Sequence, residues 1–401
     1  MKHFTGLIQI IWRRTMRDTC MKGWSRMLIA GAGILLVTAL SAQSLTWLGT
    51  LGGSWSYAYD VSPDGRVVVG VAQDQSLQPR AFRWVRGSGM QDLGTLGGTS
   101  SEARAVSGDG AIVVGIAMDA SGRWRAFRWS TATGITDMGT LGGEWSAALA
   151  MSRDGSVVAG WSDDAGGRIR PFAWNASNGM QDLGDLGGEV GAAYGVSADG
   201  RVIVGWAHTE TGARRAFRWT ELHGMQNLGT FPGGGASSAL AVSADGAVVV
   251  GAARIGPDRT DPPHLFRWTV EHGMEDLGAL PEFPMAHGFD VSDDGSVIVG
   301  YAQNEDEEYR AIWWTPTRGL ENLNTRFASL LGDGSILWTA RAVSADGRYI
   351  VGRGYNASRD RFEAFLLDTV PEPASAFLLV SMLAGGLCLC RRLRGSSPPI
   401  G

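Results

Sequence analysis

Asp92-Leu-Gly-Thr-Leu-Gly-Gly-Thr-Ser-Ser-Glu-Ala-Arg-Ala-Val-Ser-Gly-Asp-Gly-Ala-Ile-Val-Val-Gly115 is a stretch that recurs, slightly altered, along most of the chain. Its Ser-x-Asp-Gly step returns at spacings of 45, 45, 45, 46, 49 and 52 residues. The aspartates of these steps are Asp64, Asp109, Asp154, Asp199, Asp245, Asp294 and Asp346. A period of about 40 to 50 residues without a helical pattern is typical of propeller blades. The sequence therefore predicts an array of seven units.

Each unit contains four short runs that are typical of strands, separated by turn signals. In the second unit the first run is 103–106 and the second is the β-branched run 112–114. The third is 125–129, where Phe and Trp lie two residues apart, and the fourth is 134–141. Asp-Gly between two apolar runs predicts a tight hairpin. We therefore expect an all-β, seven-bladed β-propeller of four-stranded antiparallel blades.

The two ends of the array complement each other. The segment 44–51 matches the run that ends each later unit, whereas the last unit stops after its third run, at Leu367. Pairing of the N-terminal strand with the last blade would remove an open sheet edge. The sequence thus predicts that this strand closes the ring.

Composition limits the classes of partner. Residues 43–370 contain 26 Arg, no Lys and 38 Asp plus Glu, a net charge of −12 (26 minus 38). Such an acidic domain is not expected to bind nucleic acid. The cysteines are Cys20, Cys388 and Cys390, all outside the repeats, so we expect a single domain over 43–369 without disulfides.

The N-terminal segment is interpreted as a signal peptide over 1–42. A basic start at Met21 precedes an apolar run from 27 to 40, and small residues favour cleavage by signal peptidase near Ala42. Met21 is an alternative start of translation. An anchoring helix is the other reading of the apolar run, which is short for a membrane span.

The C-terminal segment has three features in order. Pro371, Glu372 and Pro373 precede an apolar run over 374–390, which is followed by Arg391, Arg392 and Arg394. The run is just long enough for a transmembrane helix, and the Arg cluster fits the cytoplasmic side. Residues 370–401 resemble the PEP-CTERM sorting signal. This resemblance implies processing by an exosortase, a transient membrane anchor, an extracellular or cell-surface destination and a link with exopolysaccharide or biofilm.

The repeats over 45–368 resemble the HAF family of extracellular repeats. The likeness rests on Gly-x-Leu-Gly-Gly, on Ser-x-Asp-Gly and on a central Ala-Phe pair. The family's recurring His is His264 in one unit and Glu363 in the last, and Arg in five others: Arg80, Arg125, Arg170, Arg215 and Arg310. The resemblance implies an extracellular location for the protein rather than a chemical activity.

The recurring aspartates invite a calcium or catalytic interpretation, but turn formation explains them better. The recurring Arg83, Arg128, Arg218 and Arg267 are expected to pair with aspartates of the fourth run, such as Asp92 and Asp137. Loops between the second and third runs, and between units, vary in length and fall on one face. Variable loops on a rigid scaffold often carry recognition. They bear the candidate binding residues Trp55, Trp124, Trp145, Phe283, Tyr309 and Trp338, unless these rings only pack beneath their loops.

No catalytic constellation, cofactor motif or metal-ligand spacing is found in the repeats. The acidic loop 304–308 could hold Ca²⁺ through its oxygens, although a solvated charge run explains it better. We therefore expect an exported binding or structural propeller, with exopolysaccharide or a surface protein as partner. The alternative is a polysaccharide-active enzyme that uses carboxylates of the variable face, such as Glu102, Glu144, Asp163, Asp164 and Glu189.

Overall fold

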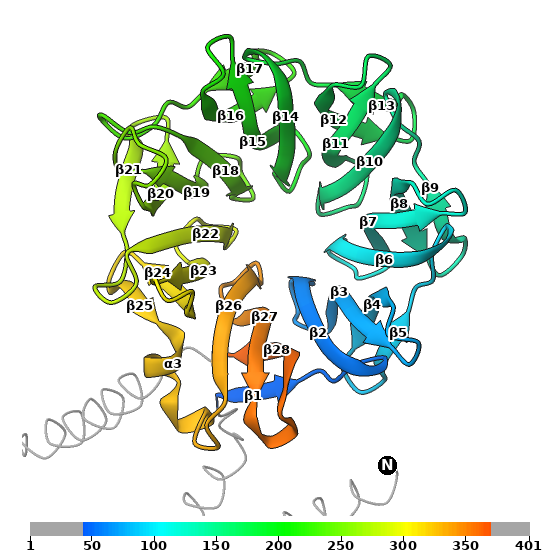
Figure 1. Cartoon of the computed structure of the whole chain (residues 1–401), viewed down its shortest axis with the longest axis vertical. Coiled ribbons are helices and arrows are strands. Elements are labelled where there is room, and N and C mark those ends of the chain that lie inside the picture. Colours follow the sequence, from blue (N-terminus) through cyan, green and yellow to red (C-terminus); the bar gives the residue numbers. More distant parts are fainter. Residues whose placement is uncertain (1–42, 370–401) are drawn as a thin grey trace, which may run out of the picture. The chain divides into compact units, whose positions relative to one another are not determined.

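The computed structural model of this protein describes residues 43–369. These residues form seven four-stranded antiparallel sheets, set as blades in a ring around a central channel (Figure 1). The predicted all-β, seven-bladed propeller is therefore confirmed. The segments interpreted as signal peptide (1–42) and as sorting signal (370–401) lie outside the described residues. Between residues 43 and 369, no helix has the length and apolar character needed to cross a membrane.

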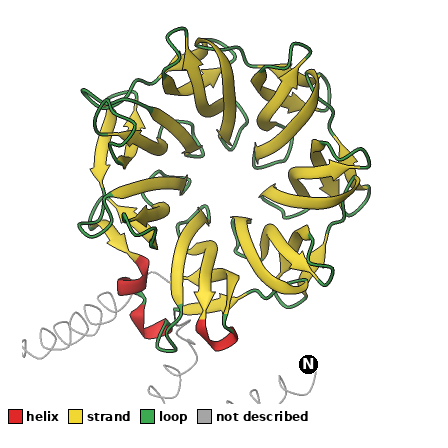
Figure 2. Cartoon of the chain, viewed as in Figure 1, coloured by secondary structure: helices red, strands yellow, loops and turns green. Residues whose placement is uncertain are grey.

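Six blades use four consecutive strands, and the seventh combines the last three strands with the first one. Blades 1 to 4 are β2(Gly52–Val61), β3(Val67–Asp74), β4(Pro79–Val85), β5(Gly89–Asp92); β6(Gly97–Val106), β7(Ile112–Asp119), β8(Trp124–Ser130), β9(Gly134–Asp137); β10(Gly142–Met151), β11(Val158–Asp164), β12(Ile169–Asn175), β13(Gly179–Asp182); and β14(Gly187–Val196), β15(Val202–Thr209), β16(Arg214–Thr220), β17(Gly224–Asn227). Blades 5 to 7 are β18(Ser237–Val242), β19(Val249–Arg254), β20(Pro263–Thr269), β21(Gly273–Gly278); β22(Met285–Val291), β23(Ile298–Gln303), β24(Tyr309–Thr315), β25(Gly319–Asn322); and β26(Ile336–Val343), β27(Tyr349–Asn356), β28(Arg361–Asp368), β1(Ser44–Trp47). Short helices lie only around blade 7 of the described chain: α3(Leu323–Arg326), η1(Ala328–Leu330) and η2(Ala357–Arg359) (Figure 2).

Strand β1 closes the ring as the sequence predicts. It pairs antiparallel with β28, from Ser44 opposite Asp368 to Trp47 opposite Phe365. The Leu48 N–H also donates to the Ala364 carbonyl at 2.9 Å. Blade 7 thereby gains its outer strand from the other end of the array, and β28 has no open edge.

The turn between the first and second strands is the same in every blade. In blade 2, Asp109 Oδ1 accepts hydrogen bonds from Ser107 Oγ (2.6 Å) and from the Ala111 N–H (2.9 Å), and Gly110 has a φ of +71°. The Ser–Asp bond recurs at 2.7 Å in the other six turns. These hydrogen bonds, first that of Ser107, lower the pKa of Asp109. The recurring aspartates thus lie in turns and hold them.

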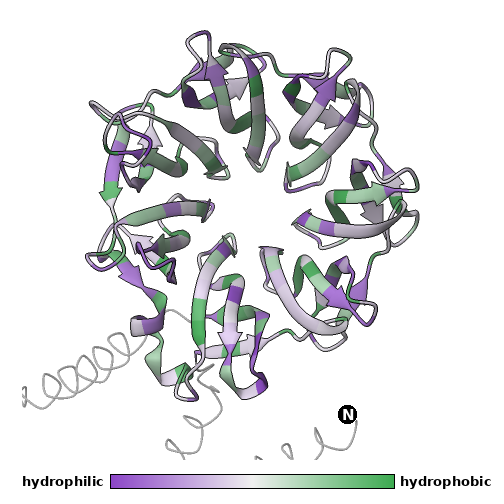
Figure 3. Cartoon of the chain, viewed as in Figure 1, coloured by the Kyte–Doolittle hydropathy of each residue, from purple (hydrophilic) through white to green (hydrophobic). Residues whose placement is uncertain are grey.

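The core lies between neighbouring blades. Fully buried third-strand side chains recur around the ring, and they are Phe82, Phe127, Phe172, Phe217, Phe266, Ile312 and Phe365. A second-strand glycine permits close approach of the first strand: a Cβ on Gly115 would lie 2.0 Å from the Glu102 carbonyl oxygen. Figure 3 shows hydrophobic residues mainly along the inner strands and hydrophilic residues mainly along the outer strands and loops.

The expected Arg–Asp pairs within blades were assigned to the wrong arginines. Arg83 Nε donates to the Gly110 carbonyl of the next blade at 2.9 Å, and Arg267 pairs with Glu275. In blades 2 and 3 the fourth-strand aspartate pairs instead with the first basic residue of the third strand, as Arg125–Asp137 (3.2 Å) and Arg170–Asp182 (3.0 Å), whereas in blade 1 Arg80 pairs with Asp74. The cause is the strand register. Phe127 lies opposite Asp137, so the side chains of Phe127 and Asp137 are on the same face of the sheet. Arg125, two residues before Phe127, shares that face, whereas Arg128 points to the other face.

Candidate functional site

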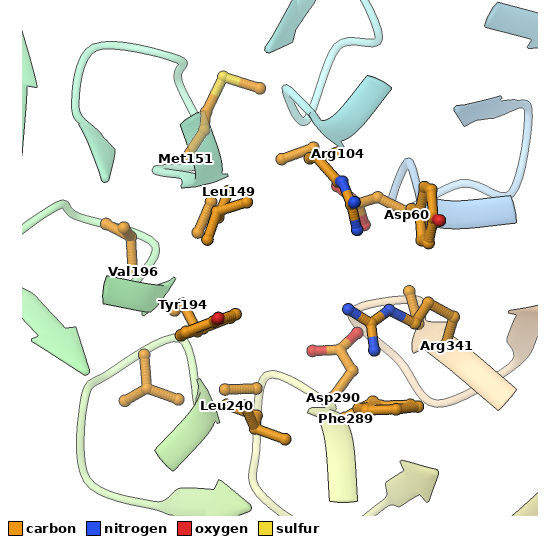
Figure 4. Close-up of a pocket in the computed structure, with 17 residues that line it drawn as sticks. Asp60, Arg104, Leu149, Met151, Tyr194, Val196, Leu240, Phe289, Asp290 and Arg341 are labelled. Carbon is orange, nitrogen blue, oxygen red and sulfur yellow. The ribbon is translucent and has the colours of Figure 1, made fainter. Parts of the chain in front are cut away.

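The first strand of every blade has a β-bulge at the same place. In blade 1, Ala58 lies opposite Gly70 and Asp60 opposite Val69, so Tyr59 has no partner in the ladder. A bulge re-aims the side chain of its extra residue. The bulge residues, all half-buried, are Tyr59, Arg104, Leu149, Tyr194, Leu240, Phe289 and Arg341. They line a channel cavity of about 190 Å³ (Figure 4).

The channel cavity has two chemically different sides. Blades 6, 7, 1 and 2 contribute the charged side, which consists of Tyr59, Asp60, Arg104, Phe289, Asp290 and Arg341. Blades 3, 4 and 5 contribute the less polar side, which consists of Leu149, Met151, Tyr194, Val196, Leu240 and Val242 (Figure 4). The arrangement suits a ligand that is charged at one end and apolar at the other.

Two carboxylates of the channel cavity tie blades together. Asp60 accepts hydrogen bonds from the N–H of Val61 (2.7 Å) and from the N–H of Val106 in blade 2 (2.8 Å). Asp290 does the same with Val291 and with Val343 of blade 7, both at 2.8 Å. The equivalent residue is Ala or Gly in the other blades. Both carboxylates are therefore engaged by backbone amides.

Burial controls the protonation of these two groups. It raises the pKa of Asp60 to about 7, and the nearby Asp290 adds to the rise, while the two N–H donors oppose it. Burial likewise raises the pKa of Asp290 to about 7, against the N–H groups of Val343 and Val291 and the charge of Arg341. The charge of the cavity consequently changes near neutral pH.

The two arginines of the channel cavity differ in their partners. Arg104 forms an ion pair with Glu102 at 2.5 Å and lies over the Tyr59 ring at 4.2 Å. Arg341 lies over the rings of Phe289 (3.9 Å) and Tyr59 (5.6 Å), and no described residue forms an ion pair or hydrogen bond with its guanidinium. Burial, together with the charge of Arg104, lowers the pKa of Arg341 to about 10. Arg341 therefore presents unused donors to the cavity.

The channel narrows at the turn side. Backbone hydrogen bonds of 2.7–3.2 Å run from blade to blade through Gly108, Arg153, Ala198, Ala244, Asp293 and Ala345. The corresponding residue of blade 1 is Pro63, which has no N–H to donate. The side chains of Arg153 and Asp293 form an ion pair between blades 3 and 6. This pair bridges the mouth of the channel below the bulge residues.

A second feature is an aromatic cluster on the face of the variable loops. Successive ring centroids are 4.8, 5.6, 5.7, 4.3 and 5.6 Å apart. The members of the aromatic cluster, in this order, are His287, Tyr301, Tyr309, Trp338, Phe362 and Tyr355. All are half-buried, so part of each ring remains accessible. Tyr309 and Trp338 thus belong to one surface, although sequence spacing does not indicate it.

The other predicted binding aromatics have different surroundings. Trp55 stacks on Tyr57, with ring centroids 4.8 Å apart. The Arg353 guanidinium carbon lies 4.5 Å from the Tyr57 ring centroid and 4.9 Å from that of Trp338, so it connects the two rings. Trp124 and Trp145 contact no other aromatic ring of residues 43–369, and Trp145 is 38% exposed. Phe283 does not fit its assignment, because it is only 5% exposed and packs in the core between blades 5 and 6. Its apolar side chain fills the gap that a rim loop leaves there.

The carboxylates of the variable face do not form a pair of free groups. Glu102 is paired with Arg104, and Asp164 is paired with Arg168 at 2.8 Å. Burial raises the pKa of Asp163, with Asp164 and Glu144 adding to the rise. In the part of the chain described, the Glu189 carboxylate forms no hydrogen bond with the other four candidate carboxylates, those of Glu102, Glu144, Asp163 and Asp164. In loop 304–308, Asn304 Oδ1 accepts the Glu308 N–H at 2.9 Å, and residues 43–369 contain no group of three His, Cys, Asp or Glu suited to a metal.

Sequence reasoning missed the channel cavity. The signal was present: the residue after the small one at Ala58, Ala103 or Ala148 varies among Tyr, Arg, Leu and Phe from unit to unit, while that small residue is Ala or Gly throughout. Asp60 and Asp290 are also the only departures from Ala or Gly at the next position. Period-2 alternation does not foresee a bulge, so these residues were read as ordinary strand positions.

Comparisons with other proteins concern the fold alone. No protein-family model matches this sequence, and neither does any curated protein. TolB from Acinetobacter baumannii is 14% identical over 65% of this chain, with a TM-score of 0.44, and the match spans 64% of TolB. A puromycin hydrolase S511A mutant complexed with PGG is 16% identical over 80% of this chain and 53% of its own, with a TM-score of 0.53. BP39L lectin from Burkholderia pseudomallei is 9% identical over 82% of this chain and 98% of its own, with a TM-score of 0.47. At 16% identity, the likeness to the puromycin hydrolase concerns the fold alone.

Proposed function

We propose that this protein is an exported binding propeller of the cell surface or extracellular matrix, and that it binds polysaccharide through the aromatic cluster. Its delivery follows from the signal peptide over 1–42 and from the PEP-CTERM-like segment over 370–401, which an exosortase would process. In this proposal the seven blades are a rigid scaffold, and the variable loops present the binding surface.

The observation that carries the proposal is the contiguity of the aromatic cluster. Its rings come from two neighbouring blades, at the strand ends next to the variable loops, and Arg353 extends it to Tyr57 and Trp55 of blade 1. Half-buried aromatic rings with polar neighbours offer flat faces to sugar rings at low conformational cost. The acidic domain as a whole argues for a neutral rather than a polyanionic glycan.

A polysaccharide-active enzyme is the alternative, and the site favours it less. A glycosidase needs two carboxyl groups about 5–10 Å apart with free oxygens. On the variable face, Glu102 and Asp164 are held by arginines. In the channel cavity, Asp60 and Asp290 each accept two backbone N–H bonds. Their roles as blade-to-blade ties need no chemistry on a substrate.

A glycan array with the fragment 43–369, which carries all the strands of the ring, tests this function. We expect binding to a neutral glycan, lost in the double variant Tyr309→Ala/Trp338→Ala. Truncating a dominant aromatic residue of a binding surface typically costs more than about 1 kcal/mol of binding free energy, so the double variant should weaken binding by about tenfold or more.

Trp145→Ala is the matched control, because it removes an exposed ring outside the aromatic cluster. Melting curves of each variant show whether the fold is kept. Loss of glycan binding in Trp145→Ala, with normal binding in the double variant, would move the site to blade 3. Release of reducing ends from a bound glycan would favour the enzyme.

The sorting proposal has its own test. Replacing Pro371, Glu372 and Pro373 with Ala should leave the chain in the membrane fraction, where the unaltered chain is released or surface-displayed. Replacing Ser397, Pro398 and Pro399 with Ala in the same tail serves as the control. Equal distribution of the first variant and the unaltered chain would contradict sorting through this motif.

A further inference from the structure

We propose that the channel cavity is a second, separate binding site, which takes a small carboxylate with an apolar body. In this site Arg341 binds the carboxylate, and the side formed by Leu149 and Leu240 contacts the apolar body. The inference does not depend on the glycan-binding proposal, because the channel cavity and the aromatic cluster are lined by different residues, which meet where Phe289 contacts Tyr301 at 5.1 Å.

Arg341 is the centre of the argument. It lies deep in the channel, yet its surface is partly accessible to the cavity. Its stacking on Phe289 and Tyr59 occupies the flat face of the guanidinium and leaves the in-plane N–H donors unused. These N–H groups are accessible from the cavity, and a carboxylate matches their fork geometry. The site therefore lacks an anionic partner at this point.

The surroundings do not supply that partner. Glu102 is already paired with Arg104, and no ion pair joins Arg341 to Asp290. In a domain whose net charge is negative, an arginine without an ion pair at the channel selects for an anion.

The opposite side selects for the body of the ligand. Leu149 and Leu240 face the cavity, and no charged residue of blades 3 and 5 lines it (Figure 4). A volume of about 190 Å³ admits a compact molecule and not a polymer chain. A carboxylate on a small ring or short alkyl chain satisfies both sides of the channel cavity, whereas a simple inorganic anion satisfies only one.

Protonation should modulate this binding. The titratable and charged groups that line the cavity around Arg341 are Tyr59 and Asp60 on β2, Arg104 on β6, Tyr194 on β14 and Asp290 on β22. Of these, Asp60 and Asp290 change charge near neutral pH. Below a pH of about 7 both carboxyl groups are protonated, so a bound anion is attracted by Arg341 without opposition from them. Above that pH the negative charges of Asp60 and Asp290 oppose the binding of an anion.

Calorimetric titration of the purified full-length chain with benzoate tests the proposal. We expect saturable binding that is tighter at about pH 6 than at about pH 8.5, on either side of the pKa of about 7. Benzamide, which has the same ring without the charge, should not bind. Hexanoate should replace benzoate, whereas inorganic phosphate and glucuronate, which lack an apolar body, should bind at least about tenfold more weakly.

Three variants locate the site. Arg341→Gln should weaken benzoate binding by about tenfold or more. Leu149→Phe should also weaken it by filling the cavity from the other side, which keeps the test decisive if Arg341→Gln does not fold. Arg201→Gln, on the turn face with its side chain 86% exposed, is the control and should bind normally.

The proposal is overturned if none of the carboxylates binds at the lower pH, or if benzoate and benzamide bind equally. Unchanged benzoate binding in folded Arg341→Gln or in Leu149→Phe would overturn it as well. If glucuronate bound and benzoate did not, the claim that the ligand has an apolar body would be wrong. Glycan binding through the aromatic cluster should be unchanged in Arg341→Gln, so the two proposals fail independently.

Discussion

The bulge residues lie on the first strands and the turn residues follow directly after those strands, yet the two sets differ in how strictly they repeat. At the turn, Ser107 and Asp109 have identical counterparts in every blade, because the backbone N–H groups that they serve are also identical. At the bulge, the backbone is again the same, but the side chain changes from Tyr59 to Arg104 to Leu149. Side chains that hydrogen-bond to the repeated backbone must be the same in every blade, whereas side chains that face the channel are free to differ. Internal variation at a constant backbone position therefore indicates a site.

Removing part of the constant framework should have the largest effect. Deletion of residues 43–48 removes β1, exposes the edge of β28 and uncovers the core that Leu45 and Trp47 pack against. We expect a strongly lowered melting temperature and association, measured by calorimetry and size-exclusion chromatography. Gln43→Ala is the control. A monomeric deletion variant that melts like the unaltered chain would show that closure is dispensable.

The stability of the protein should depend on pH through the two channel carboxyl groups, Asp60 and Asp290. An unfolded Asp has a pKa near 3.8, and the folded pKa of Asp60 and of Asp290 is about 7, so the folded state holds more protons between these values. Stability should therefore fall as pH rises from about 4 to about 7, at most by about 1.4 kcal/mol per pH unit for each carboxyl.

Asp60→Ala and Asp290→Ala are suitable variants, because Ala occupies the same position in blades 2, 3, 5 and 7. Each should flatten the dependence of the melting temperature on pH. An undiminished slope in the double variant would assign the pH dependence to other groups.

A single turn should matter less than ring closure. Asp109→Ala removes the acceptor of the Ser107 hydroxyl and of the Ala111 N–H, and should lower the free energy of unfolding by about 0.5–2 kcal/mol in urea denaturation. Asp199→Ala should behave alike, since its bonds to Ser197 and Arg201 are equivalent. Neither should change benzoate or glycan binding. Altered binding with unaltered stability would place these aspartates in a site and break the comparison.

The smallest effect is expected at the Arg153–Asp293 ion pair, whose side chains are 43% and 36% exposed. Arg153→Gln should change the free energy of unfolding by less than about 1 kcal/mol, because solvent and salt screen such pairs. The change should shrink further at high salt. A larger effect that persists in high salt would mean that the pair holds blades 3 and 6 in place.

The repeat made most of the fold predictable. Ser-x-Asp-Gly located the turns, and the missing fourth strand after Leu367 located the closing strand, because each is a local signal with one structural solution. Cross-strand partners were less predictable, as Arg125 rather than Arg128 meets Asp137, since a shift of register by one residue changes every pair. The burial of Phe283 depends on the length and path of one irregular loop, which no period describes.

The channel cavity was not predicted for two reasons. A bulge adds one residue to a strand without changing its composition, so alternation alone assigns Tyr59 to the wrong direction. The meaning of Asp60 and Asp290 also arises only when distant blades meet around the channel, where each carboxylate caps an N–H of the next blade. The aromatic cluster was half predicted, because Tyr309 and Trp338 were named but their contact with Phe362 and Tyr301 was not.

The closing pair of strands has a mechanical consequence. Ser44 lies opposite Asp368, and the Gln43 side chain donates to the Thr369 carbonyl at 3.5 Å, so the chain enters and leaves the ring at one point. A force that separates residues 43 and 369 acts at the end of the β1–β28 ladder and breaks its bonds one after another, which is unzipping, rather than loading them together in shear. Tension between the segments on either side would peel away β1 and open blade 7 while the six other blades stay folded.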